Sequence, residues 1–247
     1  MPKCGGEISF LPIYFFIHYR YICVKQNYNT EKDMKKFLFI VAAGIMAAVG
    51  CTNNQPAEKA CCQEGKNPVI ENIMARRSVR AYKEQAVPRE LMEQVLECGI
   101  NAPNAMNAQQ WEVRVVESKA WIDKATEAYK QSVKGTPAEK MVTDPSFKNM
   151  FRNAPAVIFI GCKSGKYTPV DCGLMAENMM LAAQSLGLGT VCMGSPIAFL
   201  TQPAGAEFLS SLSFSEGYEP LICIGIGYAD EAPAAKPRNK DVIKYIE

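Results

Sequence analysis

The chain has 247 residues, of which 48% are hydrophobic and 21% are charged. This composition is typical of a globular protein with a real core. The formal net charge is only +2, and no stripe of Lys and Arg accompanies it, so nucleic-acid binding has no support. The single histidine, His18, precedes the region that we expect to fold, which excludes a histidine-based triad or a histidine-rich metal site in that region.

The ten cysteines do not follow the spacing of metal or redox motifs. No C-x-x-C pair is present, so a zinc knuckle or a thioredoxin-like redox pair has no support. A free thiol within an apolar run behaves as a small hydrophobic side chain. We therefore predict that the cysteines of the later chain are core packing residues: Cys98, Cys162, Cys172, Cys192 and Cys223.

The segment 34–51 resembles a bacterial lipoprotein signal peptide. Lys35 and Lys36 precede an apolar run, 37–49, that is too short to span a bilayer as a mature helix. Small residues then lead to Cys51, the predicted lipidation site. An ordinary cleaved signal peptide and a buried helix are the alternatives.

This interpretation divides the chain into parts. A signal peptide begins at a start codon, so we interpret Met34 as the initiator and residues 1–33 as an upstream extension from a misplaced gene start. Residues 52–67 are polar and predict a flexible linker, and residues 68–247 form the folded domain. The expected location is the cell envelope, as a membrane-anchored lipoprotein facing the periplasm, or the cytoplasm if the signal is not used.

Within the folded domain, helical and strand patterns alternate. Pro88 opens a helix whose apolar residues recur at helical spacing as far as Ile100. Trp111–Val115 alternates like a half-exposed strand, whereas 156–161 and 221–227 are continuous apolar runs that suit strands covered on both faces. The alternation indicates an α/β or α+β fold with helices packed on a central sheet.

Between the last two strands, the segment 171–186 is apolar almost all round. Asp171 is placed as an N-cap, and Gly187 stands where a helix commonly ends. A helix with this pattern is buried, either in the core or against a partner subunit.

Basic residues alternate at the start of the domain, in Arg76-Arg77-Ser78-Val79-Arg80. In an extended segment, residues 76, 78 and 80 point one way and Arg77 points the other. Guanidinium groups bind phosphate oxygens in a bidentate manner, so the segment suits a phosphate. A solvated basic face at a helix end is an equally good interpretation of these residues alone.

Amide side chains gather between the first helix and the first strand, in 101–110. Each offers a donor and an acceptor, which suits the polar edge of a flavin or a nucleobase. The alternative is an Asn-rich turn. No G-x-G-x-x-G opens a helix after a strand, so a Rossmann-type dinucleotide site is disfavoured.

The two motifs together, Arg-x-Ser-x-Arg followed by Ala-Pro-x-x-x-Asn-x-Gln-x-Trp, resemble the signature of the nitroreductase family. The resemblance extends over 70–247 through Glu177-Asn178, Gly187-Leu188-Gly189-Thr190, Gly225-Ile226-Gly227-Tyr228 and Lys236-Pro237-Arg238. The chain departs from the family pattern at Asn104, where Ser is usual, and at Gln110, where Pro is usual. A Pro-x-Glu-Gly found in some members is Cys192-Met193-Gly194-Ser195 here.

The resemblance implies an α+β fold with a mostly antiparallel central sheet flanked by helices, in a homodimer that binds FMN at the subunit interface. Arg76, Ser78, Lys236 and Arg238 would hold the phosphate end, Arg80 would lie near the pyrimidine edge, and loop residues would reach the ring from the partner. The implied cofactor-binding residues are Arg76, Arg77, Ser78, Arg80, Pro103, Asn104, Asn107, Met193, Gly194, Ser195, Lys236 and Arg238.

The resemblance also implies the activity. The chain would use NAD(P)H in a ping-pong reaction at FMN to reduce nitroaromatic, quinone or similar electrophilic acceptors, with no catalytic side chain and no metal. The alternatives are a flavin reductase or dehalogenase of the same fold, and a membrane-anchored flavin-binding protein without NAD(P)H turnover.

Overall fold

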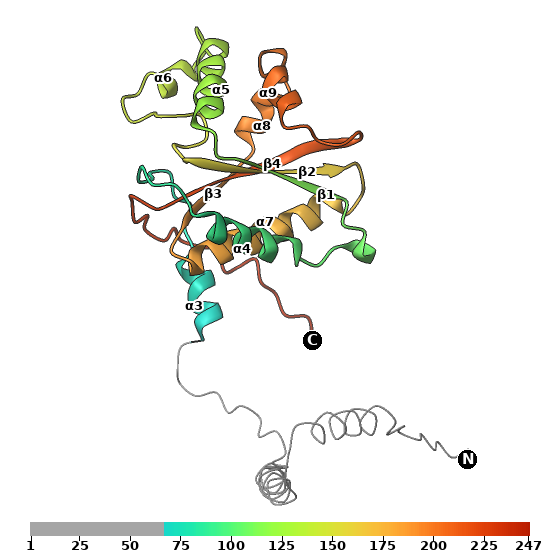
Figure 1. Ribbon diagram of the computed structural model, residues 1–247. Coiled ribbons are helices and arrows are strands. Elements are labelled where there is room, and N and C mark those ends of the chain that lie inside the picture. The colour runs from blue at the N-terminus through green and yellow to red at the C-terminus, as the bar shows by residue number, and fades with distance from the viewer. Residues whose placement is uncertain (1–66) are drawn as a thin grey trace, which may run out of the picture. The chain divides into compact units, whose positions relative to one another are not determined.

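An antiparallel sheet organises the part of the chain that the computed structural model describes, residues 67–247, within a unit that spans Gly65–Glu247 (Figure 1). The strand order is β1-β2-β4-β3, and every neighbouring pair is antiparallel. The strands are β1 (Trp111–Val116), β2 (Ala156–Lys163), β3 (Gly189–Met193) and β4 (Tyr218–Gly227). This arrangement confirms the α+β class and the antiparallel sheet expected from the sequence.

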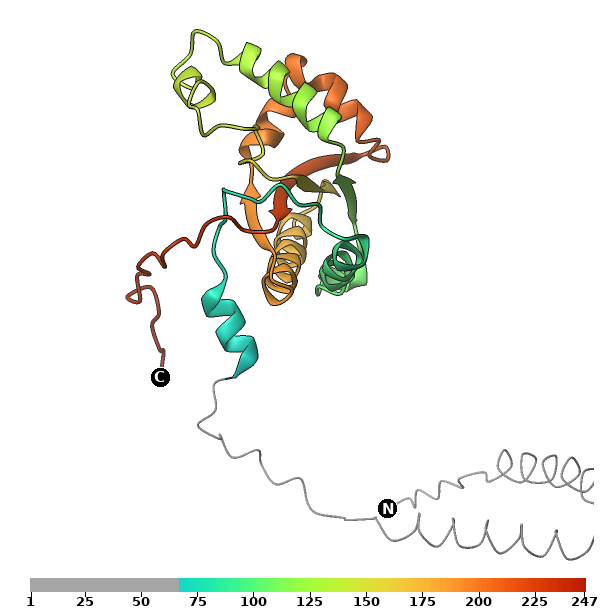
Figure 2. The ribbon, with the colours of Figure 1, turned by 60° about the vertical axis from the view of Figure 1, so that its left-hand side comes forward.

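Helices cover both faces of the sheet (Figures 1 and 2). On one face lie α4 (Arg89–Ile100) and α7 (Thr168–Ser185) side by side, with the short α3 (Pro68–Ala75) against α7. The other face carries α5 (Lys119–Ser132), α6 (Glu139–Val142), α8 (Ser195–Leu200) and α9 (Ala206–Ser211). Two 3-10 turns, η2 (Ala105–Asn107) and η3 (Pro203–Gly205), complete the elements of this region.

The continuous apolar run of β2 is explained by burial on both faces. Ile158 and Ile160 belong to the core under α4 and α7, whereas Val157 and Phe159 belong to the core under α5, α8 and α9. Side chains alternate across a strand, so a strand sandwiched between two helical layers must be apolar at every position. The prediction of a doubly covered strand is therefore confirmed.

The boundaries of α7 correct one prediction. The helix begins at Thr168 after Tyr167, with Pro169 in its first turn, so Asp171 is not the N-cap. Proline is well placed in a first turn because its missing N–H would be unpaired there in any case. The far end is as predicted, since Gly187 has a φ of 76° just after the helix.

The cysteine prediction holds only in part. Cys162, Cys172 and Cys223 are buried, but Cys98 and Cys192 are exposed. Cys98 is an exposed residue of α4 that borders an open groove also lined by α3 and α7, and Cys192 lies on β3 at the edge of the sheet. An apolar run does not reveal which residue faces outward when the element is amphipathic or at an edge.

The predictions for residues 1–66 lie outside the described residues. They include the upstream extension 1–33, the signal segment 34–51 with its lipidation site Cys51, and nearly all of the linker 52–67. They stay predictions. Of the helices between residues 67 and 247, none combines the length and hydropathy that a membrane span requires.

The contact between α4 and α7 supplies a test of the packing. A Cβ added at Gly99 of α4 would lie 2.3 Å from Cε and 2.6 Å from Cγ of Met179 on α7. We expect Gly99→Ala to destabilise the fold by about 1–3 kcal/mol, because the added methyl overpacks a filled core. Denaturant unfolding measures this loss. Glu93→Ala, at an exposed position of the same helix, should change stability by about 0.5 kcal/mol or less, and equal effects would contradict the tight contact.

Candidate functional site

The basic segment 76–80 is extended along the outer edge of β3. Ser78 forms a parallel bridge with Thr190, and the Val79 N–H donates to the Thr190 carbonyl at 2.9 Å. Side chains therefore alternate, with Val79 buried and Arg80 exposed. The extended geometry that the motif needs is present, so the alternative of a basic helix end does not describe residues 78–80.

Arg76 and Arg77 point to different places. The Nε atom of Arg76 lies 3.5 Å from Oε1 of Glu177 on α7, and the Arg76 side chain is only 22% exposed. The Arg77 guanidinium instead donates to the carbonyls of Met74 and Arg76, at 2.6 and 2.8 Å. Arg77 thus covers the end of α3 and lines a separate cavity beside Gly187.

The C-terminal arm passes beside Arg80. The carboxylate of Glu231 accepts hydrogen bonds from the backbone N–H groups of Arg80 and Ala81. Beyond that point the arm is exposed, and the Arg238 guanidinium donates only to carbonyls of its own segment. Among residues 67–247, no hydrogen bond or ion pair brings Lys236 or Arg238 to the basic segment.

The turn from β3 into α8 contains both buried and exposed residues. The Met193 side chain is buried in the core, whereas Gly194 and Ser195 are exposed, so Met193 has only its backbone to offer a ligand. Partial burial raises the pKa of the Cys192 thiol, the negative charge of Glu177 raises it further, and the positive charge of Arg76 lowers it. Both charges of the Arg76–Glu177 pair therefore act on Cys192.

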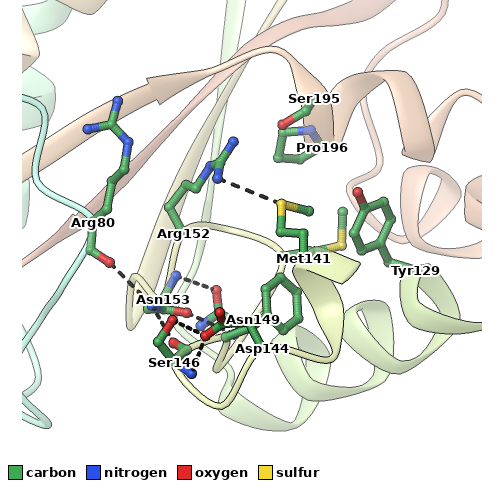
Figure 3. A pocket seen from close by; sticks show the side chains of 12 residues that line it. Arg80, Tyr129, Met141, Asp144, Ser146, Asn149, Arg152, Asn153, Ser195 and Pro196 are labelled. Atoms are coloured by element: carbon green, nitrogen blue, oxygen red, sulfur yellow. Dashed lines mark hydrogen bonds between the residues drawn. The ribbon is translucent and has the colours of Figure 1, made fainter. Parts of the chain in front are cut away.

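A cavity of about 300 Å³ opens between Arg80 and the start of α8 (Figure 3). Its floor is the loop before β2, where Asn149 is buried and Arg152 is exposed. Ser195 lines the opposite side. Two further residues of the lining, Arg152 and Asn153, were not predicted from the sequence, in which they belong to no motif of the resemblance.

The amide-rich loop closes on itself. Oδ1 of Asn104 accepts from the Gln109 N–H at 2.9 Å, as the turn interpretation requires. Met106, Asn107 and Gln109 all have positive φ, which is uncommon for residues other than glycine. Pro103 and Asn107 are exposed, so their side chains are available to a ligand or a partner.

This loop is held at the beginning of α7. The Ala105 N–H lies 3.3 Å from both carboxylate oxygens of Asp171. Glu177, which pairs with Arg76, follows six residues later, or about 9 Å along the helix axis. The two motifs of the resemblance are thus fixed at different points of α7 within one subunit.

Comparison with known proteins identifies the family. The Nitroreductase family model matches residues 73–228. A putative NADH dehydrogenase/NAD(P)H nitroreductase of Methanothermobacter thermautotrophicus is 29% identical over 72% of this chain and 83% of its own. An FMN reductase of Bacillus subtilis is 28% identical over 70% of each chain. The crystal structure of a nitroreductase with bound FMN from Bacteroides fragilis is similar with a TM-score of 0.66 at 25% identity, covering 74% of this chain and all of that one. The chain belongs to the nitroreductase family.

A close approach at Gly189 makes the placement of the basic segment testable. A Cβ there would meet Cγ2 of Val79 at 2.9 Å and its Cβ and Cγ1 at 3.0 Å. Valine is stiff about χ1, so we expect Gly189→Ala to push residues 78–80 away from β3. Hydrogen exchange of the Val79 amide should accelerate by about tenfold or more, which corresponds to a loss of about 1.4 kcal/mol or more.

The matched control is Gly173→Ala on α7, where an added Cβ meets nothing within 4 Å. Exchange at Val79 should not change in that variant. Unchanged exchange at Val79 in Gly189→Ala would contradict the close packing of the segment on β3.

Proposed function

We propose that this protein is an FMN-dependent oxidoreductase that uses NAD(P)H to reduce nitroaromatic, quinone or similar electrophilic acceptors. Family membership and the names of the relatives support an NAD(P)H-dependent flavoenzyme. The observation that carries the proposal is the extension of residues 76–80 along β3, which sends Arg76 and Arg77 to different places and leaves Arg80 at the cavity.

The residues present fit FMN. Arg76 offers a guanidinium oriented by Glu177, and Ser78 offers a hydroxyl on the same extended segment. Charge-assisted hydrogen bonds of this type suit a phosphate. Arg80 and Ser195 stand at the rim of the adjacent cavity. A ring bound beside that rim would place its developing negative charge near the Arg80 cation, which would stabilise it. When bound, FMN supplies the redox chemistry, which we propose to be ping-pong between NAD(P)H and the acceptor.

The three buried thiols between residues 67 and 247 are unsuited to nucleophilic work. Burial raises the pKa of Cys172 to about 12 and also raises the pKa of Cys162 and Cys223. A thiol with a raised pKa stays neutral near pH 7, whereas the thiolate is the nucleophile. The role of the protein in this proposal is therefore to bind, orient and stabilise charge.

We further propose that the site is completed by a second copy of the chain. The amide loop and the basic segment are separated along α7, so one subunit does not bring Pro103, Asn104 and Asn107 to Arg80. Large apolar side chains are also exposed on the helices of this face of the sheet: Val69, Ile70, Ile73 and Met74 on α3, and Val170 and Leu174 near the start of α7. Exposed apolar patches of this kind commonly mark interfaces.

A flavin reductase is the second candidate. It is favoured by the FMN reductase of Bacillus subtilis, which aligns with 70% of this chain. In that case free flavin would replace the nitroaromatic or quinone as acceptor. Steady-state NADH oxidation with nitroaromatics, quinones and free flavin as alternative acceptors separates the two.

Arg76 and Arg77 form a matched pair for testing the phosphate site. We expect Arg76→Ala to weaken FMN binding by about 1.5–3 kcal/mol, the usual contribution of a hydrogen bond to a charged group. Arg77→Ala should have a much smaller effect, because its guanidinium covers the end of α3. Titration of the apoprotein with FMN, followed by flavin fluorescence, measures both. Equal losses would refute the assigned geometry.

The proposed dimer predicts that a charged residue introduced on one face of the sheet disrupts the dimer, whereas one introduced on the opposite face does not. Leu174 is 42% exposed on α7, and a carboxylate there would be buried without a partner in an interface. We expect Leu174→Glu to convert the dimer to monomers with reduced FMN retention, as measured by light scattering and the flavin spectrum. Ala206→Glu, at an exposed position of α9 on the opposite face, should stay dimeric. A wild-type chain that is monomeric and still holds FMN would contradict the dimer.

A further inference from the structure

Arg152 points into the cavity of Figure 3 without a carboxylate to neutralise it. Its one polar side-chain contact is with Sδ of Met141 at 3.8 Å, and a thioether is a weak acceptor. The Arg80 guanidinium, on the same cavity, donates only to the Ser78 carbonyl. Between residues 67 and 247, neither guanidinium forms an ion pair.

The backbone that carries Arg152 is held in an unfavourable conformation. Arg152 and Asn153 have φ values of 56° and 66°, a region that costs about 1–3 kcal/mol for residues other than glycine and persists only where its surroundings enforce it. Such strain clusters at functional sites. The position of Arg152 is therefore built into the loop rather than left to a flexible surface.

Two asparagine side chains enforce this conformation. Oδ1 of the buried Asn149 accepts from the N–H groups of Phe151 and Asn153, at 2.9 and 3.1 Å. The Nδ2 group of the Asn153 side chain donates to the backbone carbonyls of Arg80, at 3.3 Å, and Ser146, at 3.1 Å. The backbone of Arg152 is thus fixed relative to that of Arg80, which places both cations at one cavity.

The charge of the lining favours an anion. Its ionisable groups that carry charge near neutral pH are two guanidiniums and one carboxylate, Asp144. Oδ1 of Asp144 accepts from the N–H and hydroxyl of Ser146, and these hydrogen bonds hold its pKa below the usual value. The carboxylate therefore stays ionised, but among residues 67–247 it forms no ion pair with Arg152, and the two guanidiniums outnumber it in the lining.

The remaining walls suit an aromatic ring. Tyr129, Met141, Phe147 and Pro196 contribute aromatic, thioether and ring surfaces. The volume of about 300 Å³ lies at the lower end of small-molecule pockets, enough for a compact aromatic compound. The lining thus combines these apolar surfaces with polar and charged side chains, and suitably placed polar groups fix the orientation of a bound ligand.

We propose that this cavity binds the electron acceptor and that Arg152 selects acceptors that carry an anionic group, such as a carboxylate or sulfonate on a nitroaromatic or quinoid ring. The proposal rests on the proposed function and names the substrate class of that site. Arg152 would bind the anionic group, while the reducible group lies toward Arg80 and Ser195.

The test compares two acceptors of nearly the same shape, 4-nitrobenzoate and 4-nitrobenzamide, with the holoenzyme and NADH. We expect the wild type to favour the anion. Arg152→Gln should lower the ratio of kcat/KM for the anion over the amide by about 10- to 100-fold, the range for losing a charged hydrogen bond. The change should arise mainly in KM, and Arg152→Lys should restore part of the ratio.

Arg89→Gln is the matched control, because Arg89 is an exposed arginine paired with Glu117 and lies outside the cavity lining. In Arg89→Gln, the ratio of kcat/KM for 4-nitrobenzoate over 4-nitrobenzamide should equal that of the wild type. Isothermal titration of 4-nitrobenzoate into the oxidised holoenzyme gives a readout without turnover, and Arg152→Gln should weaken that binding by the same factor.

Three outcomes would overturn the proposal. An unchanged ratio with weaker FMN retention in Arg152→Gln would assign Arg152 to the cofactor. An unchanged ratio with a selective rise in the KM for NADPH over NADH would assign it to a phosphate of the donor. Equal losses with both acceptors would make its role structural. If no acceptor supports NAD(P)H oxidation, the proposed function fails, and the calorimetric comparison of wild type and Arg152→Gln still decides whether the cavity selects the anion.

Discussion

The packing of residues 76–80 against the edge of β3 is the constraint on which the site depends. It rests on the Val79–Thr190 hydrogen bond and on the absence of a side chain at Gly189, where Val79 approaches within contact distance. An edge strand has unpaired backbone groups, and this segment satisfies one of them at Thr190. The extended conformation that results sends Val79 into the core and leaves Arg80 outside.

Several other features follow from that contact. Because the segment leaves α3 next to α7, Arg76 meets Glu177. Because it continues past the end of β4, Arg80 and Tyr82 pair with the C-terminal arm at Glu231 and Ala229. The basic segment therefore contacts the first described helix, the edge of the sheet and the C-terminal arm. It also places Arg80 at the cavity beside the start of α8.

The electrostatic character of the site comes from incomplete neutralisation. Arg77 is satisfied by backbone carbonyls, and Arg76 is paired with a carboxylate that is itself 45% exposed. Arg80 and Arg152 are not ion-paired, and the nearby Asp144 is held by Ser146. A cationic site of this kind attracts anionic ligands and stabilises charge that develops during reduction.

Sequence patterns predicted the elements whose environment is uniform along their length. β2 is apolar from Ala156 to Cys162 because helices cover both of its faces. α7 ends just before Gly187, where the chain turns with positive φ. Patterns failed where a residue has a partner far away in the sequence. Asp171 looked like a cap but binds the Ala105 N–H, and Cys192 looked like core but lies at an exposed edge.

By itself the sequence determined the family and, through that resemblance, the antiparallel α+β class. It also determined the alternation of Arg76, Ser78 and Arg80 and the positions of α4 and α7, whereas α3 and α5 were not predicted. The alternation and the two helices are local properties, because periodicity and short motifs record which way neighbouring side chains point. Only the tertiary structure decided that Arg152 shares a cavity with Arg80, and that the amide loop is held at a different point of α7 from Arg76. The physical reason is that these relations depend on how separate segments return to one place on the sheet, which no local pattern encodes.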